Sequence, residues 1–538
     1  MRINIKSLFA VCTAVVFTGC TDLDVDIESQ YTSYPTTDIA VEAKMADVYF
    51  HLRGVLGRRY MEAQTLSSDE YTAVSYGGGW YDNGAYAHPS LHNYQPEDAT
   101  IDWMGELTGG ITKANTVIRD LGGDEAGELI APARAMRAFF HFIMMDCWGD
   151  APILDHLLAE GELIDRSPRG DVARWIESEL LEIIPQLTDE VSDNTYGKPN
   201  KWMAEALLVK LYINWAVYTA PSVDQYEAST AINEKLNDCI KYCDEIIASG
   251  KFNLGSMPYA EKFGPDNGPQ VEDFIYAMPY DTYTEKGMQH GRARTWKHAA
   301  DVEKSYYGMK LSNSAGGYMT MNPEYSALFC LEGDVRNNSV LMDTVHVYDP
   351  NTYQPTDEIA LDESGNPIVL TQTVTLAKPN DPILDVGDNI NGYNQGYRSV
   401  KFFVIDDDYK NGRDQSNDFP IFRYADILLT KAEAIVRGGT ATNGDTPMSL
   451  FNQIREYAEA PLITNNPTLQ DLLDERGREF FDECWRRNDM IRFGTFENEY
   501  GFHRKDFPTA RFEKTCRIFP LHQDMLNTNP NWEQNPGY

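Results

Sequence analysis

Hydrophobic side chains recur at helical spacing along much of the chain. Between residues 201 and 218, Met203, Leu207, Leu211 and Trp215 repeat every four residues, which places them on one face of a helix. Lys201, Glu205 and Lys210 fall elsewhere, so this helix is predicted to be amphipathic. Similar patterns predict helices in eight further segments, at residues 38–56, 102–120, 126–148, 171–188, 231–249, 424–437, 447–459 and 468–488. The pattern therefore predicts a mainly α-helical protein.

The connections between the last of these helices predict how they are arranged. Gly438-Gly439 ends the helix at 424–437, and Thr446-Pro447 supplies a cap and a first-turn proline for the next helix. Such pairs predict a tetratricopeptide-like scaffold of helical hairpins, although no clean 34-residue repeat is present.

Long irregular segments interrupt the helical pattern. Residues 66–100 and 251–335 are crowded with Gly, Pro, Asn, Tyr and Trp, which favour turns. Residues 342–395 form a third irregular insertion, in which Ile368 to Leu376 predicts a strand and a minor β-hairpin. Long loops rich in aromatic residues favour a functional role.

The first twenty residues have the layout of a secretory signal peptide. Arg2 and Lys6 precede an apolar run at residues 8–17, which is too short to span a bilayer as a helix, and Gly19-Cys20 follows. This segment resembles a bacterial lipobox, with Phe17 as a departure, and the resemblance implies that Cys20 is lipidated. Ordinary secretion with cleavage nearby is the alternative.

Acidic residues follow directly after Cys20, at Asp22, Asp24, Asp26 and Glu28. They resemble the surface-export signal of some Gram-negative lipoproteins, and the alternative is a solvated acidic leader. We therefore expect a protein anchored in outer-membrane lipid through Cys20 and facing the cell exterior.

The charge balance excludes some partners. The 538 residues contain 46 Lys and Arg against 82 Asp and Glu, a net charge of -36, while the hydrophobic share of 42% is usual for a globular protein. Such a surface repels nucleic acid. The cysteines are too sparse for a disulfide framework, and Cys239 and Cys243, four residues apart, favour structural burial over a shared metal.

Enzyme motifs are absent from the sequence. It contains no G-x-S-x-G elbow, no phosphate-binding glycine loop and no His-Glu-x-x-His. Carboxylates are so abundant that a glycosidase pair stays open, but no particular pair stands out. Gly77-Gly78-Gly79 leads into Trp80-Tyr81, which indicates a loop that presents aromatic rings. Binding, without catalysis, is the favoured function.

Several motifs occur in a recognisable order. Phe422-Arg423-Tyr424-Ala425-Asp426-Ile427-Leu428-Leu429 through Ala434 resembles the R-x-A-E-x-L-L-x-x-A-E-A helix of the SusD/RagB family of nutrient-binding outer-membrane lipoproteins. Residues 473–494 resemble the E-R-x-R-E-L block of this family. The C-terminal residues 519–538 resemble its final N-P and Q-N-P-G-Y motifs, and residues 134–152 resemble its R-A-x-x-Y and F-G-D-x-P segment. Cys484 and His522 replace the usual Gly and Pro.

This resemblance implies a surface lipoprotein that captures an oligosaccharide and delivers it to a SusC-like TonB-dependent barrel, with no cofactor. A peptide-binding relative is the second alternative, and a surface glycosidase is the third. The implied organisation is a signal peptide at 1–19, an acidic leader at 20–37, an N-terminal helical region at 38–250, a loop-rich insertion at 251–420 and a C-terminal helical region at 421–538.

Aromatic loops supply the candidate glycan site. Sugar rings present apolar C–H faces beside hydroxyl rims, which suit flat Trp or Tyr rings bordered by polar groups. One candidate group comprises Asp69, Glu70, Trp80, Tyr81, Asn83 and Tyr86, and the other Arg292, Arg294, Trp296, Tyr306, Tyr307 and Tyr318. The alternative is that each ring packs its loop onto the scaffold.

Charged residues of the C-terminal motif are expected on helix surfaces. Glu475 with Arg478 or Glu479, and Glu483 with Arg487, have the three- or four-residue spacing of helix-face pairs, each worth about a few tenths of a kcal/mol.

Overall fold

The computed structural model describes residues 37–297, 311–410 and 412–538. The predictions for Cys20, the signal peptide, the acidic leader, Tyr306 and Tyr307 lie outside these residues. Within them, no helix combines the length and the apolar character needed to cross a bilayer.

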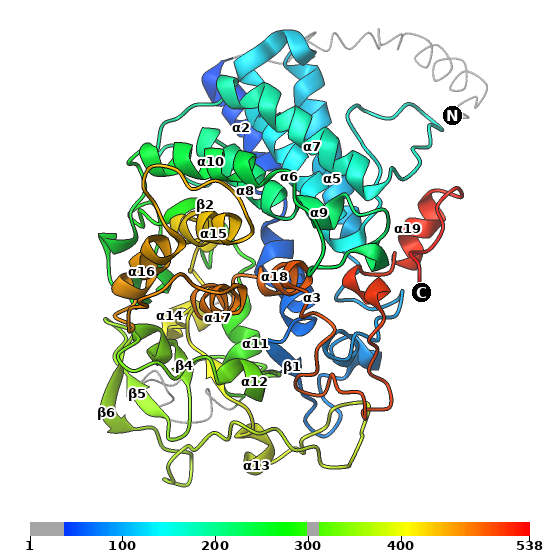
Figure 1. The fold of residues 1–538 in the computed structure, drawn as a ribbon. Helices are drawn as coiled ribbons and strands as arrows, with labels where there is room; N and C mark the ends of the chain where they lie inside the picture. Colours follow the sequence, from blue (N-terminus) through cyan, green and yellow to red (C-terminus); the bar gives the residue numbers. More distant parts are fainter. Residues whose placement is uncertain (1–36, 298–310, 411) are drawn as a thin grey trace, which may run out of the picture.

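Helices dominate the described chain (Figure 1), as predicted. The longer ones are α2 (Asp38–Tyr49), α3 (Tyr60–Leu66), α5 (Met104–Asp120), α6 (Ala131–Trp148), α7 (Arg169–Ile183), α8 (Lys201–Ile213), α10 (Leu236–Ala248), α15 (Tyr424–Val436), α16 (Pro447–Tyr457), α17 (Leu469–Phe480), α18 (Arg486–Phe493) and α19 (Gln523–Thr528). The short ones are α4 (Ala87–Ser90), α9 (Trp215–Tyr218), α11 (His290–Arg294), α12 (Pro323–Ser326), α13 (Ile390–Tyr393) and α14 (Asp406–Tyr409).

The helices pack against one another in chain order, as a scaffold of hairpins requires. α5 packs on α6, α6 on α7, α7 on α8, and α8 on α10. α10 then packs directly on α15, although residues 249–423 separate them in the sequence, and α15 continues to α16 and α17. These residues therefore leave the helical stack uninterrupted, and they form much of the lower left part of the molecule in Figure 1.

Several predicted helices differ in detail from the observed ones. The helix predicted at 38–56 ends at Tyr49 as α2, and two others are divided. The segment 468–488 is two helices, α17 and α18, because Asp482 and Cys484 between them adopt left-handed φ angles of 69° and 68°. The segment 201–218 is likewise divided at Asn214 into α8 and α9.

The predicted amphipathic character of α8 is wrong. Every residue from Trp202 to Ile213 is buried, because α7, α10 and α15 surround the helix. Lys210, expected on a polar face, instead forms an ion pair of 2.5 Å with the buried Asp426 of α15. The four-residue spacing identified the helix but not its central position.

Short antiparallel strand pairs fasten the loops to the scaffold. β1 (Tyr71–Ala73) pairs with β3 (Met319–Met321), β2 (Phe274–Met278) with β8 (Phe419–Arg423), β4 (Val340–Leu341) with β7 (Arg398–Ser399), and β5 (His346–Tyr348) with β6 (Pro355–Ile359). A hairpin does occur within the insertion at 342–395, but it is β5–β6 and does not include the predicted strand. The strand predicted over residues 368–376 is wrong, because this segment makes only isolated bridges.

Candidate functional site

A tight turn presents Trp80 at the surface. The backbone N–H groups of Tyr76 and Gly79 donate to each other's carbonyls at 3.1 Å, and Gly77 and Gly78 supply the positive φ angles, 61° and 87°, that a two-residue hairpin turn needs. Trp80 itself has a φ of 70°. A bulky residue in this region is strained, so the surrounding contacts must hold it there.

The indole of Trp80 rests on two tyrosines, and we call these three rings the Trp80 platform. Trp80 stacks on Tyr318 with a centroid distance of 4.2 Å and an interplanar angle of 22°, and meets Tyr86 edge-on at 5.9 Å. Tyr318 Oη donates to Glu62 at 2.6 Å, and Tyr86 Oη accepts from Arg58 at 2.9 Å. Both supporting rings are therefore fixed by hydrogen bonds to α3 and to the turn before it.

The exposed part of this loop carries free polar groups. Trp80 and Tyr81 are half-buried, and Asn83 is exposed with a φ of 56°. Among the described residues, the side chains of Tyr81 and Asn83 have no hydrogen-bond partner. An aromatic ring beside available phenol and amide groups can accept a sugar face and bind its hydroxyls.

The remaining predicted residues are mostly buried in the scaffold. Glu70 accepts from the Asp482 backbone N–H at 3.0 Å, and burial, followed by the nearby Asp482 carboxylate, raises the pKa of Glu70 to about 8. Arg294 pairs with Asp482 at 3.1 Å, and Asp69 pairs with Arg486 at 2.7 Å. These contacts join the base of the loop to the C-terminal helices, and direct ligand contact by these residues stays a prediction.

Trp296 also lies inside the molecule. Its side chain is 1% exposed, and its Nε1 donates to Asn394 at 2.9 Å. This burial favours a supporting role, while its predicted contact with a ligand remains untested.

The rim of the site includes residues that the sequence did not single out. Tyr393 meets Tyr76 edge-on at 5.3 Å, and the Lys297 ammonium lies 4.5 Å from the centroid of the Tyr76 ring and 4.7 Å from that of Tyr393. Lys297 also pairs with Asp388 at 3.3 Å. Residues 388–393 come from the irregular insertion, and no local sequence pattern places them near Trp80.

Cavities also lie elsewhere in the described structure, and two of them are large. One of about 340 Å³ is lined by residues 191–200 and strand β2, and one of about 370 Å³ by α5, residues 152–164 and α19. Neither contains any of the predicted site residues. We favour the Trp80 platform because it combines a strained loop, stacked rings and free polar groups.

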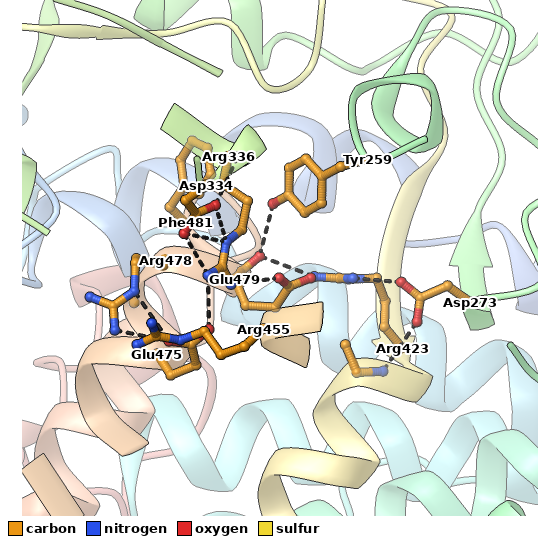
Figure 2. A network of polar contacts seen from close by, with 12 residues as sticks. Tyr259, Asp273, Asp334, Arg336, Arg423, Arg455, Glu475, Arg478, Glu479 and Phe481 are labelled. Carbon is orange, nitrogen blue, oxygen red and sulfur yellow. Dashed lines mark hydrogen bonds and ion pairs between the residues drawn. The ribbon is translucent and has the colours of Figure 1, made fainter. Parts of the chain in front are cut away.

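The expected pair of Glu475 with Arg478 is confirmed, but the charged residues of the C-terminal motif are buried and do not lie on a helix surface. Glu475 accepts from Arg336 at 2.8 Å, Arg455 at 2.6 Å and Arg478 at 2.9 Å (Figure 2). Glu479 pairs with Arg336 at 3.0 Å. Although burial raises the pKa of Glu475, Arg336 and then Arg478 outweigh it and hold that pKa at about 2.

Arg423 links this network to the insertion. It donates to Asp273 of the insertion at 2.6 Å and to Glu483 at 2.8 Å. Glu483 also pairs with Lys401 at 2.6 Å, so the expected pair of Glu483 with Arg487 is wrong. Arg487 instead donates to backbone carbonyls. The motif therefore joins segments that are distant in the sequence.

Known protein families match the two regions of the chain that carry most of the sequence motifs. Residues 384–538 match the model of the SusD family, and residues 23–213 match a model described as starch-binding associating with outer membrane. The chain belongs to the SusD/RagB family. The SusD/RagB resemblance noted in the sequence is thereby confirmed.

Several SusD/RagB relatives cover most of the chain. The starch-binding protein SusD of Bacteroides thetaiotaomicron is 24% identical over 85% of this chain and 82% of its own length, and a SusD-like protein of Bacteroides ovatus is 22% identical over 94% and 87%. Among solved structures, a laminarin binding SusD-like protein superposes with a TM-score of 0.69 at 19% identity, covering 93% of this chain and 100% of that chain.

A second solved structure gives the same result. Surface glycan-binding protein A from Bacteroides fluxus has a TM-score of 0.68 at 16% identity, covering 94% of this chain and 100% of its own. At these identities the likeness establishes the SusD/RagB fold, and the binding site is argued from this chain's own residues.

Proposed function

We propose that this SusD/RagB chain is a cell-surface lipoprotein that binds an oligosaccharide or polysaccharide at the Trp80 platform and delivers it to a SusC-like TonB-dependent transporter. The observation that carries the proposal is the strained loop that holds Trp80 on Tyr318 beside the unpartnered side chains of Tyr81 and Asn83. Relatives described as starch-binding and laminarin binding support a glycan over a peptide.

The platform suits a sugar for physical reasons. Tyr318 and Tyr86 fix the indole before a ligand arrives, so little side-chain entropy is lost on binding. The hydroxyl rim of a sugar needs donors and acceptors at the edge of the ring, which Tyr81 and Asn83 provide. An apolar peptide side chain would leave these polar groups without partners. No catalytic role is proposed for any residue of the platform.

The substitution Trp80→Ala tests this proposal. We expect it to weaken binding of a cognate oligosaccharide about tenfold or more, because it removes the stacking surface. Titration calorimetry of oligosaccharides identified on a glycan array measures the loss. Trp175→Ala is the matched control, since Trp175 is also half-buried but lies on α7.

Other outcomes of the same titration contradict the proposal. Binding by Trp80→Ala that equals the wild type would exclude the platform as the site. Binding of peptides alone would favour the peptide-transport alternative, and release of sugars from polysaccharide by the pure protein would favour a glycosidase.

Membrane attachment through Cys20 and the barrel partner belong to the same proposal and rest on family membership. We expect Cys20→Ala to move the protein from the outer-membrane fraction into the soluble fraction, because the acyl chains are lost. Retention of the Cys20→Ala variant in the membrane would contradict the anchor.

We also expect the wild-type protein to copurify with a TonB-dependent barrel from detergent-solubilised outer membranes.

A further inference from the structure

Arg292 lies beside the Trp80 platform in a fixed position. Its guanidinium carbon is 5.5 Å from the centroid of the Trp80 ring. Its carbonyl accepts from the backbone N–H groups of Gly316 and Gly317 at 2.7 and 3.0 Å, and its Nη1 donates to Gln289 at 3.0 Å. The guanidinium is therefore held over the ring on which a sugar would stack.

Arg292 has no counterion among the described residues. No carboxylate lies within ion-pair distance of it, and its buried Nε has no hydrogen-bond partner. Arg294, two residues further along α11, pairs with Asp482 at 3.1 Å. A partly buried positive charge without a counterion is costly, so its persistence requires an explanation.

The surroundings of Arg292 are positive as well. Burial lowers the pKa of Arg292, and the nearby guanidinium groups of Arg58 and Arg413 lower it further. Arg58 and Arg59 share the single carboxylate of Glu62, each at 2.9 Å. The carboxylate of Glu62 thus neutralises two guanidinium groups at once, and it also accepts a hydrogen bond from Tyr318.

Arg413 completes this group and also lacks an ion pair within the described residues. The adjacent Asp414 accepts from Gln289 at 2.9 Å and pairs with no arginine. The exposed Asp82 of the Trp80 loop pairs with neither Arg292 nor Arg413. Arg292 and Arg413 therefore stand near the aromatic platform without ion pairs among the described residues, in a chain whose net charge is -36.

We propose that the glycan bound at the Trp80 platform is acidic, and that Arg292, assisted by Arg413, binds a carboxylate or sulfate group on the sugar. This inference rests on the proposed glycan-binding function. A planar guanidinium donates two parallel hydrogen bonds to such groups. The anion supplies the charge that Arg292 lacks, while the sugar ring to which it is attached stacks on Trp80.

Matched pairs of oligosaccharides test the proposal. One arm compares uronate oligosaccharides with the same molecules after carboxyl reduction, and the other compares sulfated oligosaccharides with their desulfated forms. We expect the acidic member of one pair to bind at least tenfold more tightly than its neutral counterpart. The pair that shows this difference distinguishes a carboxylate from a sulfate.

Variants then assign the contact to this group. Arg292→Gln is expected to weaken binding of the acidic member about tenfold or more and to leave binding of the neutral member unchanged, because only the charged contact is lost. Trp80→Ala is expected to weaken both. Arg174→Gln is the matched control, because Arg174 is an exposed arginine on α7 that pairs with Asp171. Circular dichroism checks folding, and Arg413→Gln provides a second variant with the same expected selectivity.

The outcomes separate this inference from the proposed function. The acidic and neutral members could bind equally, with no effect of Arg292→Gln or Arg413→Gln and with loss of binding in Trp80→Ala. This result would overturn the proposal that the ligand is acidic and would leave the proposed glycan binding intact. Failure of every oligosaccharide to bind the wild-type protein would overturn both.

Discussion

Gly316 determines where the Trp80 ring can lie. A Cβ atom at this position would stand 2.6 Å from Trp80 Cζ2 and 3.1 Å from the Arg292 carbonyl oxygen, which is closer than normal packing permits. We therefore expect Gly316→Ala to displace the indole and to weaken oligosaccharide binding about tenfold. Titration calorimetry measures the affinity, and tryptophan fluorescence reports the displacement.

Gly54→Ala is the control for this prediction, because an added Cβ there meets no atom within 4 Å and the backbone is helical. It should bind as the wild type does. Wild-type affinity in Gly316→Ala would show that the indole position does not decide binding.

Glu70 gives the stability of the protein a pH dependence. Its pKa is raised from 4.5 to about 8, so between these values the folded state holds a proton that the unfolded state has released. Stability therefore falls as the pH rises from about 5 to 8. We expect Glu70→Gln, which cannot ionise, to reduce this fall, as measured by urea unfolding at several pH values. Glu456→Gln, an exposed change, should leave the slope as it is.

At the scale of the elements, Arg423 connects strand β8 to α17 and to the insertion. Removal of its side chain leaves Asp273 and Glu483 with fewer partners in a buried site. We expect Arg423→Ala to lower the free energy of unfolding by about 3 to 5 kcal/mol, as for other buried ion pairs that lose one partner. Chemical denaturation measures it.

The exposed pair of Arg174 and Asp171 provides the comparison, because Arg174→Ala is expected to cost about 1 kcal/mol or less. Similar costs for the two variants would mean that the buried network contributes little to stability.

Elements with a local signal were predictable from the sequence, and those defined by distant partners were not. Helical periodicity identified α5, α6, α10 and α15 within a few residues, although only α5 and α10 bury a single stripe, whereas α6 and α15 are buried on all sides along most of their length. It did not show that α8 is buried all round, or that Glu475 pairs with Arg336, which is 139 residues away. The strand expected at 368–376 fails because its β-branched residues find no extended partner strand.

The same distinction holds for the candidate site. The Gly77-Gly78-Gly79 turn and the adjacent Trp80 have a local signature, since glycine permits the positive φ angles of the turn. Tyr393 and Lys297 reach the site only through the folding of the insertion. Burial of Glu70 and Arg294 follows from contacts with Asp482, which no pattern around residue 70 reveals.

For the whole molecule, the buried network implies that the C-terminal helices depend on the rest of the chain. A fragment of residues 421–538 keeps Arg423 and Glu475 but lacks Asp273 and Arg336, their partners in the intact protein. We therefore expect this fragment alone to show no cooperative unfolding transition by circular dichroism. A sharp transition in the isolated fragment would contradict this view.

The contact between Tyr71 and Asp482 has a consequence for biosynthesis. These two residues are 411 positions apart, and the Tyr71 hydroxyl donates to Asp482 at 2.5 Å inside the finished structure. At ribosomal rates of about 5 to 20 residues per second, the earlier segment waits roughly 20 to 80 s for its partner to be made. Throughout that interval Tyr71 and Glu70 lack their final neighbour Asp482, so this part of the structure cannot be completed until translation is nearly finished.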